Sequence, residues 1–237
     1  MADVLAIGAH PDDVELAMGG LLLRLRDAGR SVAILDLTRG EAGTRGTPEI
    51  RAKEAAAAAR LLGAEERTIL DLGDARLEPG LEARRAVVDA IRRLRPSLVL
   101  AARPGDLHPD HAAAGEAVRS VRYVCGMAKW HPGPHPPHRP RDFLFSMHHS
   151  TDLPPSLVVD VTPVFERKMA LVRCFASQLH DPASKEPGTR ISSEDFLPAW
   201  EARHRWFGER IGVRYGEPWY CEGPVPVTDP AFLLRKD

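Results

Sequence analysis

Cysteine is scarce in this chain of 237 residues, and its three cysteines, Cys125, Cys174 and Cys221, stand far apart. With no CxxC pair, the sequence offers neither a cysteine-based zinc site nor a disulfide framework, and we expect reduced, packed thiols. Long apolar runs and a basic leader segment are also missing. We therefore expect a cytoplasmic protein that does not enter a membrane.

An excess of one charge is missing as well, because 32 Lys and Arg residues stand against 33 Asp and Glu residues. Bulk charge therefore gives no reason to expect nucleic acid or an anionic membrane as a partner. Hydrophobic residues make up 43% of the chain, which is enough for a sizeable core. The length suits one α/β domain, and we expect a single domain over residues 1–237.

Short apolar runs alternate with helical patterns in the first half of the chain. We expect strands at residues 4–7, 32–37, 68–72 and 97–101, and helices that end at Gly29 or cover 48–62, 81–94 and 111–124. Continuously apolar strands separated by helices are typical of parallel βαβ units. The pattern predicts an α/β fold, a Rossmann-like, doubly wound, mostly parallel sheet with helices on both faces.

The C-terminal half is less regular. Residues 130–141 are rich in proline and predict a surface loop. Strands are expected at 143–147 and 157–161, followed by helices at 163–179 and 193–211. Trp206, Phe207 and Ile211 on the last helix have the spacing of a core stripe. We expect this half to cover one side of the sheet.

Two polar motifs follow predicted strands. His10-Pro11-Asp12-Asp13 comes directly after the first strand, and His108-Pro109-Asp110-His111 comes a few residues after the fourth. In the commonest doubly wound order, strands 1 and 4 flank the point where the strand order reverses, and ligands bind beyond the strand ends there. The two motifs should therefore meet in one crevice.

The residue types in this crevice match a catalytic zinc site. Such sites use three protein ligands, often imidazole and carboxylate, and leave a fourth position for water. Two histidines and one carboxylate can be drawn from the motifs, and the remaining groups can serve as a general base and an oxyanion donor. Helix capping explains one such motif alone, but two at adjacent strand ends favour a metal-dependent hydrolase.

At these residues the sequence resembles the PIG-L/LmbE-like family of zinc N-acetylglucosaminyl deacetylases. The stretches that carry the resemblance are GAHPDDVELAMGG and HPDH, with weaker similarity in LTRGEAGTRGTPEIRAKEA, FASQ and IGVRYGE. The bacterial branch that includes the deacetylases of bacillithiol biosynthesis is the most similar. The resemblance implies removal of an N-acetyl group from a small amino-sugar conjugate, foremost N-acetylglucosaminyl malate, with a mycothiol-type inositol conjugate or chitobiose as alternatives.

The resemblance also implies a role for each residue of the motifs. One Zn2+ per chain, or Fe2+, would be held by His10, Asp13 and His111. Asp12 would be the general base. His108 would stabilise the oxyanion and would be oriented by Asp110. Family members often form trimers or hexamers, so a homo-oligomer is implied as well.

Four further residues match family positions for substrate contact: Glu41, Arg51, Gln178 and Tyr215. An arginine fork suits a carboxylate such as that of malate, although Arg51 can also pair with Glu54 on its own helix. The bacillithiol branch often has an arginine at the position of Leu107, and Arg103 is a possible replacement.

Other histidines give weaker signals. Irregular spacing makes His131, His135 and His138 a less favoured metal site than a solvated loop, whereas His148 and His149 follow a strand and can line the crevice. A nucleotide-binding module is disfavoured because GxGxxG is absent after the first strand. A two-metal phosphoesterase would need further carboxylates, with Asp36 and Asp71 as candidates. A non-catalytic interaction protein also remains open.

Overall fold

A computed structural model describes residues 1–149 and 153–225. Within them, seven strands form one sheet in the order β3-β2-β1-β4-β5-β7-β6. Strands β1 to β5 pair in parallel, and β7 runs antiparallel between β5 and β6. The strands are β1 (Val4–Gly8), β2 (Val32–Asp36), β3 (Glu66–Ile69), β4 (Leu98–Ala102), β5 (Asp142–Ser146), β6 (Leu157–Asp160) and β7 (Gly216–Tyr220).

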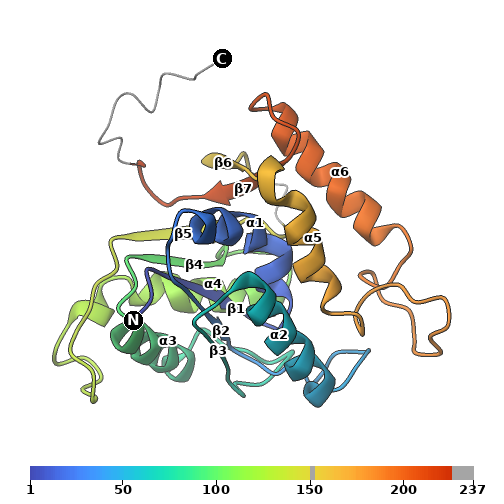
Figure 1. The fold of residues 1–237 in the computed structure, drawn as a ribbon. Coiled ribbons are helices and arrows are strands. Elements are labelled where there is room, and N and C mark those ends of the chain that lie inside the picture. The colour runs from blue at the N-terminus through green and yellow to red at the C-terminus, as the bar shows by residue number, and fades with distance from the viewer. Residues whose placement is uncertain (150–152, 226–237) are drawn as a thin grey trace.

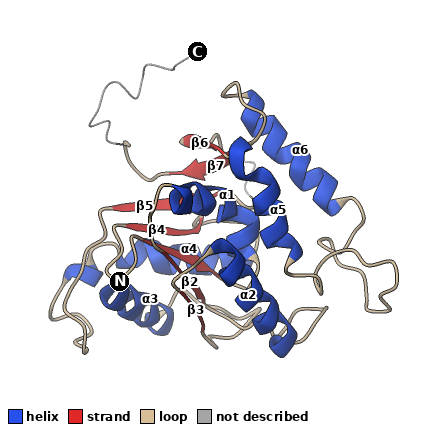
Figure 2. Ribbon diagram, viewed as in Figure 1, coloured by secondary structure: helices blue, strands red, loops and turns tan. Residues whose placement is uncertain are grey.

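Helices cover both faces of this sheet (Figures 1 and 2). α3 and α4 pack together on one face, and α1, α2 and α5 contact one another on the other. The six α-helices of the described residues are α1 (Asp13–Asp27), α2 (Pro48–Leu62), α3 (Leu81–Leu94), α4 (Pro109–Val121), α5 (Phe165–Arg173) and α6 (Phe196–Glu209). None of them has the length and apolar character needed to cross a bilayer.

Alternate residues of the central strand face two separate cores. Leu5 and Ile7 of β1 belong to the core under α3 and α4, whereas Val4 and Ala6 belong to the core under α1 and α5. This is why β1 is apolar at every position: side chains alternate between faces, and both faces are covered. The predicted Rossmann-like architecture is confirmed.

The strand order also places β1 beside β4, with Ile7 opposite Ala101. Since β2 and β3 lie on one side of this pair and β5 on the other, the order reverses here. The carboxyl ends of β1 and β4 therefore open the crevice in which doubly wound sheets bind their ligands.

Several expected boundaries shift in the structure. The third strand is β3, which begins at Glu66 rather than at residue 68, and it is only half-buried because it forms an edge of the sheet. The helix expected over 163–179 ends at Arg173. On α6, Phe207 is buried but Trp206 is 55% exposed, because successive helical residues point in different directions.

The C-terminal strand β7 lies inside the sheet, between β5 and β6, and it ties the two halves of the molecule together. Its Glu217 accepts hydrogen bonds of 2.9 Å from the backbone amides of Gly20 and Leu21 on α1. Lys168 on α5 donates to the same carboxylate at 2.6 Å. Gly20 permits this approach, because a Cβ there would lie 2.6 Å from Glu217. The helix whose N-terminus carries the first motif is thereby fixed to β7.

Candidate metal centre and active site

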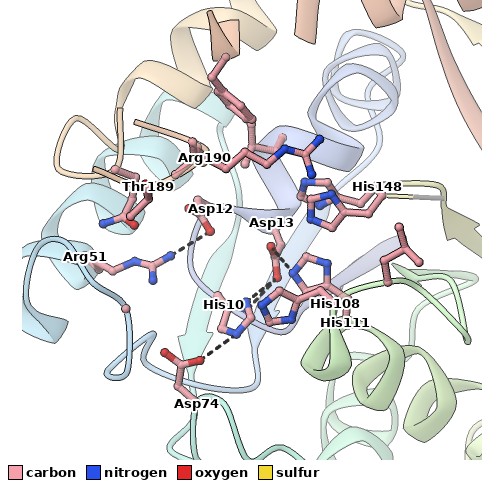
Figure 3. Close-up of a pocket in the computed structure, with 17 residues that line it drawn as sticks. His10, Asp12, Asp13, Arg51, Asp74, His108, His111, His148, Thr189 and Arg190 are labelled. Carbon is pink, nitrogen blue, oxygen red and sulfur yellow. Dashed lines mark hydrogen bonds and ion pairs between the residues drawn. The ribbon is translucent and has the colours of Figure 1, made fainter. Parts of the chain in front are cut away.

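The two motifs occupy the turns that lead from strands into helices. His10 to Asp12 form the turn between β1 and α1, and α1 begins at Asp13. His108 is the N-cap of α4, which has Pro109 in its first turn. Both motifs line one cavity of about 450 Å³, and the segment 189–191 and Phe196 close it from the opposite side (Figure 3).

The side chains of His10, Asp13 and His111 place their candidate metal-donor atoms close together. One Asp13 oxygen lies 3.0 Å from Nε2 of His111, and the other lies 3.4 Å from Nδ1 of His10. One donor atom from each of the three residues falls within 4.8 Å of the others, and all three residues are buried. Two imidazoles and one carboxylate are a common donor set for catalytic zinc, so the predicted ligand residues do converge.

Further carboxylates hold the outer nitrogens of these histidines. Nε2 of His10 lies 3.0 Å from Asp74 and 3.1 Å from Asp110, and Nδ1 of His111 lies 3.4 Å from Asp106. Carboxylates in such positions fix the tautomer and orientation of a metal-binding imidazole. The structure thus leaves Nδ1 of His10 and Nε2 of His111 directed at Asp13.

The carboxylates of this cluster favour a positively charged partner. Burial lowers the pKa of His111, but Asp13 and Asp106 outweigh it and raise that pKa to about 9. Burial likewise opposes protonation of His10, yet Asp13, Asp110 and Asp74 raise its pKa well above the usual value. For Asp13, the two histidines overcome burial and hold the pKa well below its ordinary value. A divalent cation would satisfy the same carboxylate by displacing the histidine protons.

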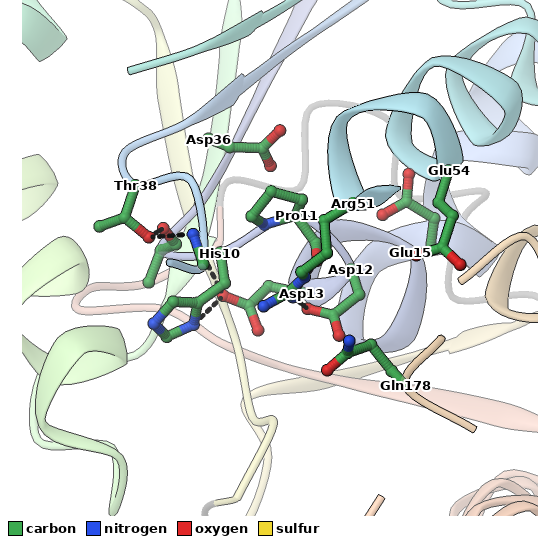
Figure 4. A network of polar contacts seen from close by, with 12 residues as sticks. His10, Pro11, Asp12, Asp13, Glu15, Asp36, Thr38, Arg51, Glu54 and Gln178 are labelled. Atoms are coloured by element: carbon green, nitrogen blue, oxygen red, sulfur yellow. Dashed lines mark hydrogen bonds and ion pairs between the residues drawn. The ribbon is translucent and has the colours of Figure 1, made fainter. Parts of the chain in front are cut away.

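Asp12 lies beside this cluster in a different environment. Its backbone has φ 125°, a left-handed value that is uncommon outside glycine and marks a held turn. Burial raises the pKa of Asp12 to about 6, even though Arg51 opposes the rise. Nη2 of Arg51 donates to Asp12 at 2.9 Å and also to the carbonyl of Pro11 (Figure 4). A carboxyl group with a pKa near neutrality can both accept and release a proton.

His108 stacks on His111 with ring centroids 4.4 Å apart. Burial and the neighbouring His111 lower its pKa. Its orientation differs from the one implied by the resemblance. Nδ1 of His108 accepts from the backbone amide of Asp110 at 3.3 Å, whereas the Asp110 carboxylate contacts His10 and the amides of Ala75 and Leu77. Asp110 thus supports the candidate ligand His10 with its side chain and His108 with its backbone.

Two more histidines complete the cavity wall. The rings of His148 and His149 stack 4.2 Å apart and lie 5.0 and 5.3 Å from that of His111. Burial, together with the charge of His111, lowers the pKa of His149 to about 4 and that of His148 well below its usual value. Both line the cavity, as their position after the strand led us to expect, and the lowered pKa values favour neutral imidazoles there.

The four expected substrate residues separate into two groups. Arg51 and Gln178 line the cavity. Gln178 also donates to the carbonyl of Arg45 at 2.8 Å, which holds the loop before α2. Glu41 and Tyr215 do not line it. Glu41 accepts from the amide of Asp74 at 2.8 Å, and Tyr215 donates to Glu201 at 2.8 Å. Glu41 therefore holds the backbone of the lining residue Asp74 without lining the cavity itself, whereas Tyr215 is paired with α6 away from the cavity.

The residues considered for other sites also have clear positions. Asp36 is buried against Arg67 at 2.6 Å, and the side chain of Asp71 is 62% exposed, so neither reaches the cavity. Arg103 donates to the carbonyl of Gly105 at 3.2 Å and lies outside the lining, whereas Leu107 sits 80% exposed at the mouth. Within the described residues, the histidines at 131, 135 and 138 form no metal-binding group.

Sequence reasoning missed Asp74 and Asp106. The rule that ligands bind beyond the carboxyl ends of parallel strands could have identified both residues. Asp74 follows β3 and Asp106 follows β4, at the same edge of the sheet. Asp106 also accepts from the amides of His108 and His149, at 3.0 and 3.2 Å. The carboxylate of Asp106 therefore contacts three cavity histidines, the ring of His111 and the backbone amides of His108 and His149.

Fold and site together define a Rossmann-like enzyme with a candidate His/Asp metal centre at the switch point of its sheet. Residues 5–122 match the family model described as GlcNAc-PI de-N-acetylase, PIG-L. A diacetylchitobiose deacetylase of Thermococcus kodakarensis is 31% identical over 90% of this chain and 80% of its own length. The chain belongs to the PIG-L family, and it is an N-deacetylase, a hydrolase of carbon–nitrogen bonds.

Two further similarities cover most of the chain. A probable N-acetyl-alpha-D-glucosaminyl L-malate deacetylase 2 of Bacillus anthracis is 30% identical over 74% of this chain and 80% of its own length. The crystal structure of a conserved protein from Thermus thermophilus superposes with a TM-score of 0.84 at 35% identity, covering 96% of this chain and 98% of that one. The names of the two deacetylases state different substrates, and that of the Thermus thermophilus protein states none.

Proposed function

We propose that this chain is a zinc-dependent hydrolase that removes the N-acetyl group from an N-acetylglucosaminyl conjugate, foremost N-acetylglucosaminyl malate. The support for the reaction is the family membership together with the names of its relatives, a diacetylchitobiose deacetylase and a probable N-acetylglucosaminyl malate deacetylase. The observation that carries the mechanism is the position of Asp12, which adjoins the convergent donors His10, Asp13 and His111 without being one of them.

The donor set fits one divalent metal, with His10, Asp13 and His111 as its ligands. A metal bound there would polarise the amide carbonyl and lower the pKa of water. Asp12 accepts a proton at its carboxylate from the attacking water and later returns it to the leaving amine. Its pKa of about 6 in the metal-free chain suits both directions of transfer. Arg51 holds this carboxylate in place at 2.9 Å.

His108 is the side chain best placed to assist the carbonyl oxygen. It lines the cavity and stacks on His111, so a donor proton on its free nitrogen would face the reacting group. Removing one oxyanion donor typically slows an acyl transfer about 100- to 1,000-fold. Asp110 and Asp74 both approach Nε2 of His10 and fix the orientation of its ring.

The test combines metal analysis with acetate and amine release from N-acetylglucosaminyl malate, diacetylchitobiose and N-acetylglucosaminyl inositol. The wild-type protein should bind one zinc ion and deacetylate at least one of these substrates. Asp12→Asn should retain the zinc but lose about 100- to 10,000-fold in kcat, because asparagine cannot take up the proton. Asparagine is preferred to alanine since it tolerates the positive φ of this position better.

A zinc-free Asp12→Asn protein would show that Asp12 is a ligand rather than the base. Asp71→Asn is the matched control, because Asp71 is an exposed carboxylate outside the cavity. A protein that binds two metals, releases no acetate from these substrates and hydrolyses a phosphomonoester offered in a parallel assay would replace the proposal by a phosphoesterase. The positions of Asp36 and Asp71 away from the cavity disfavour that alternative.

A further inference from the structure

The cavity wall opposite the metal donors carries one positive charge that the chain itself does not use. Two lining residues are permanently cationic, Arg51 and Arg190. Arg51 is committed to Asp12 and Pro11. Arg190 is exposed, and among the described residues its side chain has no hydrogen bond or ion pair. Figure 3 shows its guanidinium extending across the cavity toward His148.

The backbone that presents Arg190 is well held. Thr189 and Ser192 on either side are linked by hydrogen bonds of 2.8 and 3.2 Å between side chain and backbone. The carbonyl of Arg190 accepts from the hydroxyl of Ser193 at 2.9 Å. A fixed main chain with an unpartnered cationic side chain is an arrangement that can bind an anion at a small entropic cost.

The charge of Arg190 also acts on a second arginine near the cavity, Arg203. Burial lowers the pKa of Arg203, the Asp106 carboxylate opposes this change, and the charge of Arg190 lowers the pKa further. The acidic side chains of the lining, Asp12, Asp13 and Asp74, all belong to the metal-donor side. The guanidinium of Arg190 is thus a cationic group of the lining that approaches His148 and is paired with none of these carboxylates.

We propose that Arg190 binds a carboxylate on the aglycone of the substrate. This contact makes the chain selective for acidic N-acetylglucosaminyl conjugates. This inference rests on the proposed deacetylase function. An arginine fork matches the planar carboxylate with two parallel hydrogen bonds. A single unpaired cation suits a carboxylate better than a phosphate dianion, which ordinarily gathers several donors. Leu107, at the cavity mouth, supplies no charge for the same purpose.

The experiment compares N-acetylglucosaminyl malate with its dimethyl ester, which has the same skeleton and no charge. We expect the wild-type zinc enzyme to favour the acid about tenfold in kcat/KM. Arg190→Met should lose about tenfold on the acid, through KM and not kcat, and less than about twofold on the ester. Arg190→Lys should fall between them, because a lysine keeps the charge without the fork. Added salt should weaken the preference, since the guanidinium is exposed.

Lys185→Met is the matched control. Lys185 is an exposed cation of the same loop, and it does not line the cavity. It should leave both substrates unaffected. If the wild-type enzyme deacetylates acid and ester equally, or if Arg190→Met slows both alike, the inference is refuted and the deacetylase function stands. If the zinc-loaded protein releases acetate from no substrate, the proposed function fails, and the inference fails with it.

Discussion

Replacing Arg51 with methionine tests whether this residue acts on the substrate or on the general base. The family resemblance gave it substrate contact, whereas the structure pairs it with Asp12 at 2.9 Å. These roles predict different kinetics. Loss of a substrate contact raises KM and leaves the pH profile in place. Loss of a cation beside the base raises the pKa of Asp12 and moves the acidic limb of the profile.

The size of the shift follows from the geometry. Two unit charges about 4 Å apart interact by about 4 kcal/mol at an effective dielectric constant of 20. Arginine neighbours lower carboxyl pKa values by about 1 to 3 units. Burial already raises the pKa of Asp12 to about 6 with Arg51 present. A bound metal lowers this pKa in both proteins, so the difference between them is retained.

The expected result is an acidic limb of kcat/KM about 1 to 3 pH units higher in Arg51→Met than in the wild type. Asp12 must be ionised to accept a proton, so activity is lost as the pH falls through its pKa. The variant should therefore be weakest at low pH and should recover within a few fold at high pH. The assay is acetate release by the zinc-loaded proteins between pH 5 and pH 9.5, about the range in which such a limb can be followed.

Two further variants make this result decisive. Arg51→Lys keeps the charge and loses the fork, so its acidic limb should stay near that of the wild type. Lys53→Met removes an exposed cation from the same helix and should change nothing. An unshifted limb in Arg51→Met, with an increase in KM alone, would refute the positioning role and restore the substrate role. Thermal melts confirm that each variant is folded, since breaking a buried pair can cost about 3 to 5 kcal/mol.

Two other predictions test contacts that the sequence did not reveal. Asp74→Asn should weaken zinc binding about tenfold in a competition titration, because the carboxylate that accepts from His10 becomes an amide. An affinity unchanged from the wild type would show that Asp110 alone orients His10. Arg92→Met should lower the free energy of unfolding by about 2 to 4 kcal/mol in urea melts. Arg92 donates to the carbonyls of four residues, Cys125, Met127, Trp130 and His131. The neighbouring Arg93→Met, which loses only an exposed pair, should cost less than about 1 kcal/mol, and equal losses would contradict the argument.

The part of the fold that builds the site was predictable because its signals are local. β1, β2 and β4 are buried, largely apolar strands, and each is followed by a helical pattern. Parallel βαβ connectivity leaves few possible strand orders, and the observed order joins β1 to β4. The convergence of His10 and His111 follows from that adjacency alone.

The C-terminal strand could not be predicted in the same way. β7 is five residues long, contains Pro218 and carries the charged Glu217 at a buried position. Each of these features argues against an interior strand when the sequence is considered alone. What stabilises it is non-local: Lys168 and the amides of α1 neutralise Glu217, although they lie 49 to 197 residues away in sequence.

Partner choice within the site was equally inaccessible from the sequence. Whether the Asp110 carboxylate meets His108 or His10 depends on how the first turn of α4 faces the β1 turn, which no spacing rule gives. Two carboxylates, Asp74 and Asp110, reach Nε2 of His10 from different strand ends. An imidazole nitrogen has one proton to donate, so the second carboxylate adds mainly negative potential. That potential favours a cation at the centre of the cluster.

Reaction and selectivity therefore arise from different parts of the chain. The residues proposed for the reaction lie at strand ends and helix N-termini. The sheet holds these positions rigidly. The residue proposed for selectivity, Arg190, sits on the loop between α5 and α6, whose course follows from hydrogen bonds such as Thr189 to Ser192. Loops tolerate change better than strands. A substitution in this loop should therefore alter the choice of aglycone in this chain without disturbing His10, Asp13 or His111.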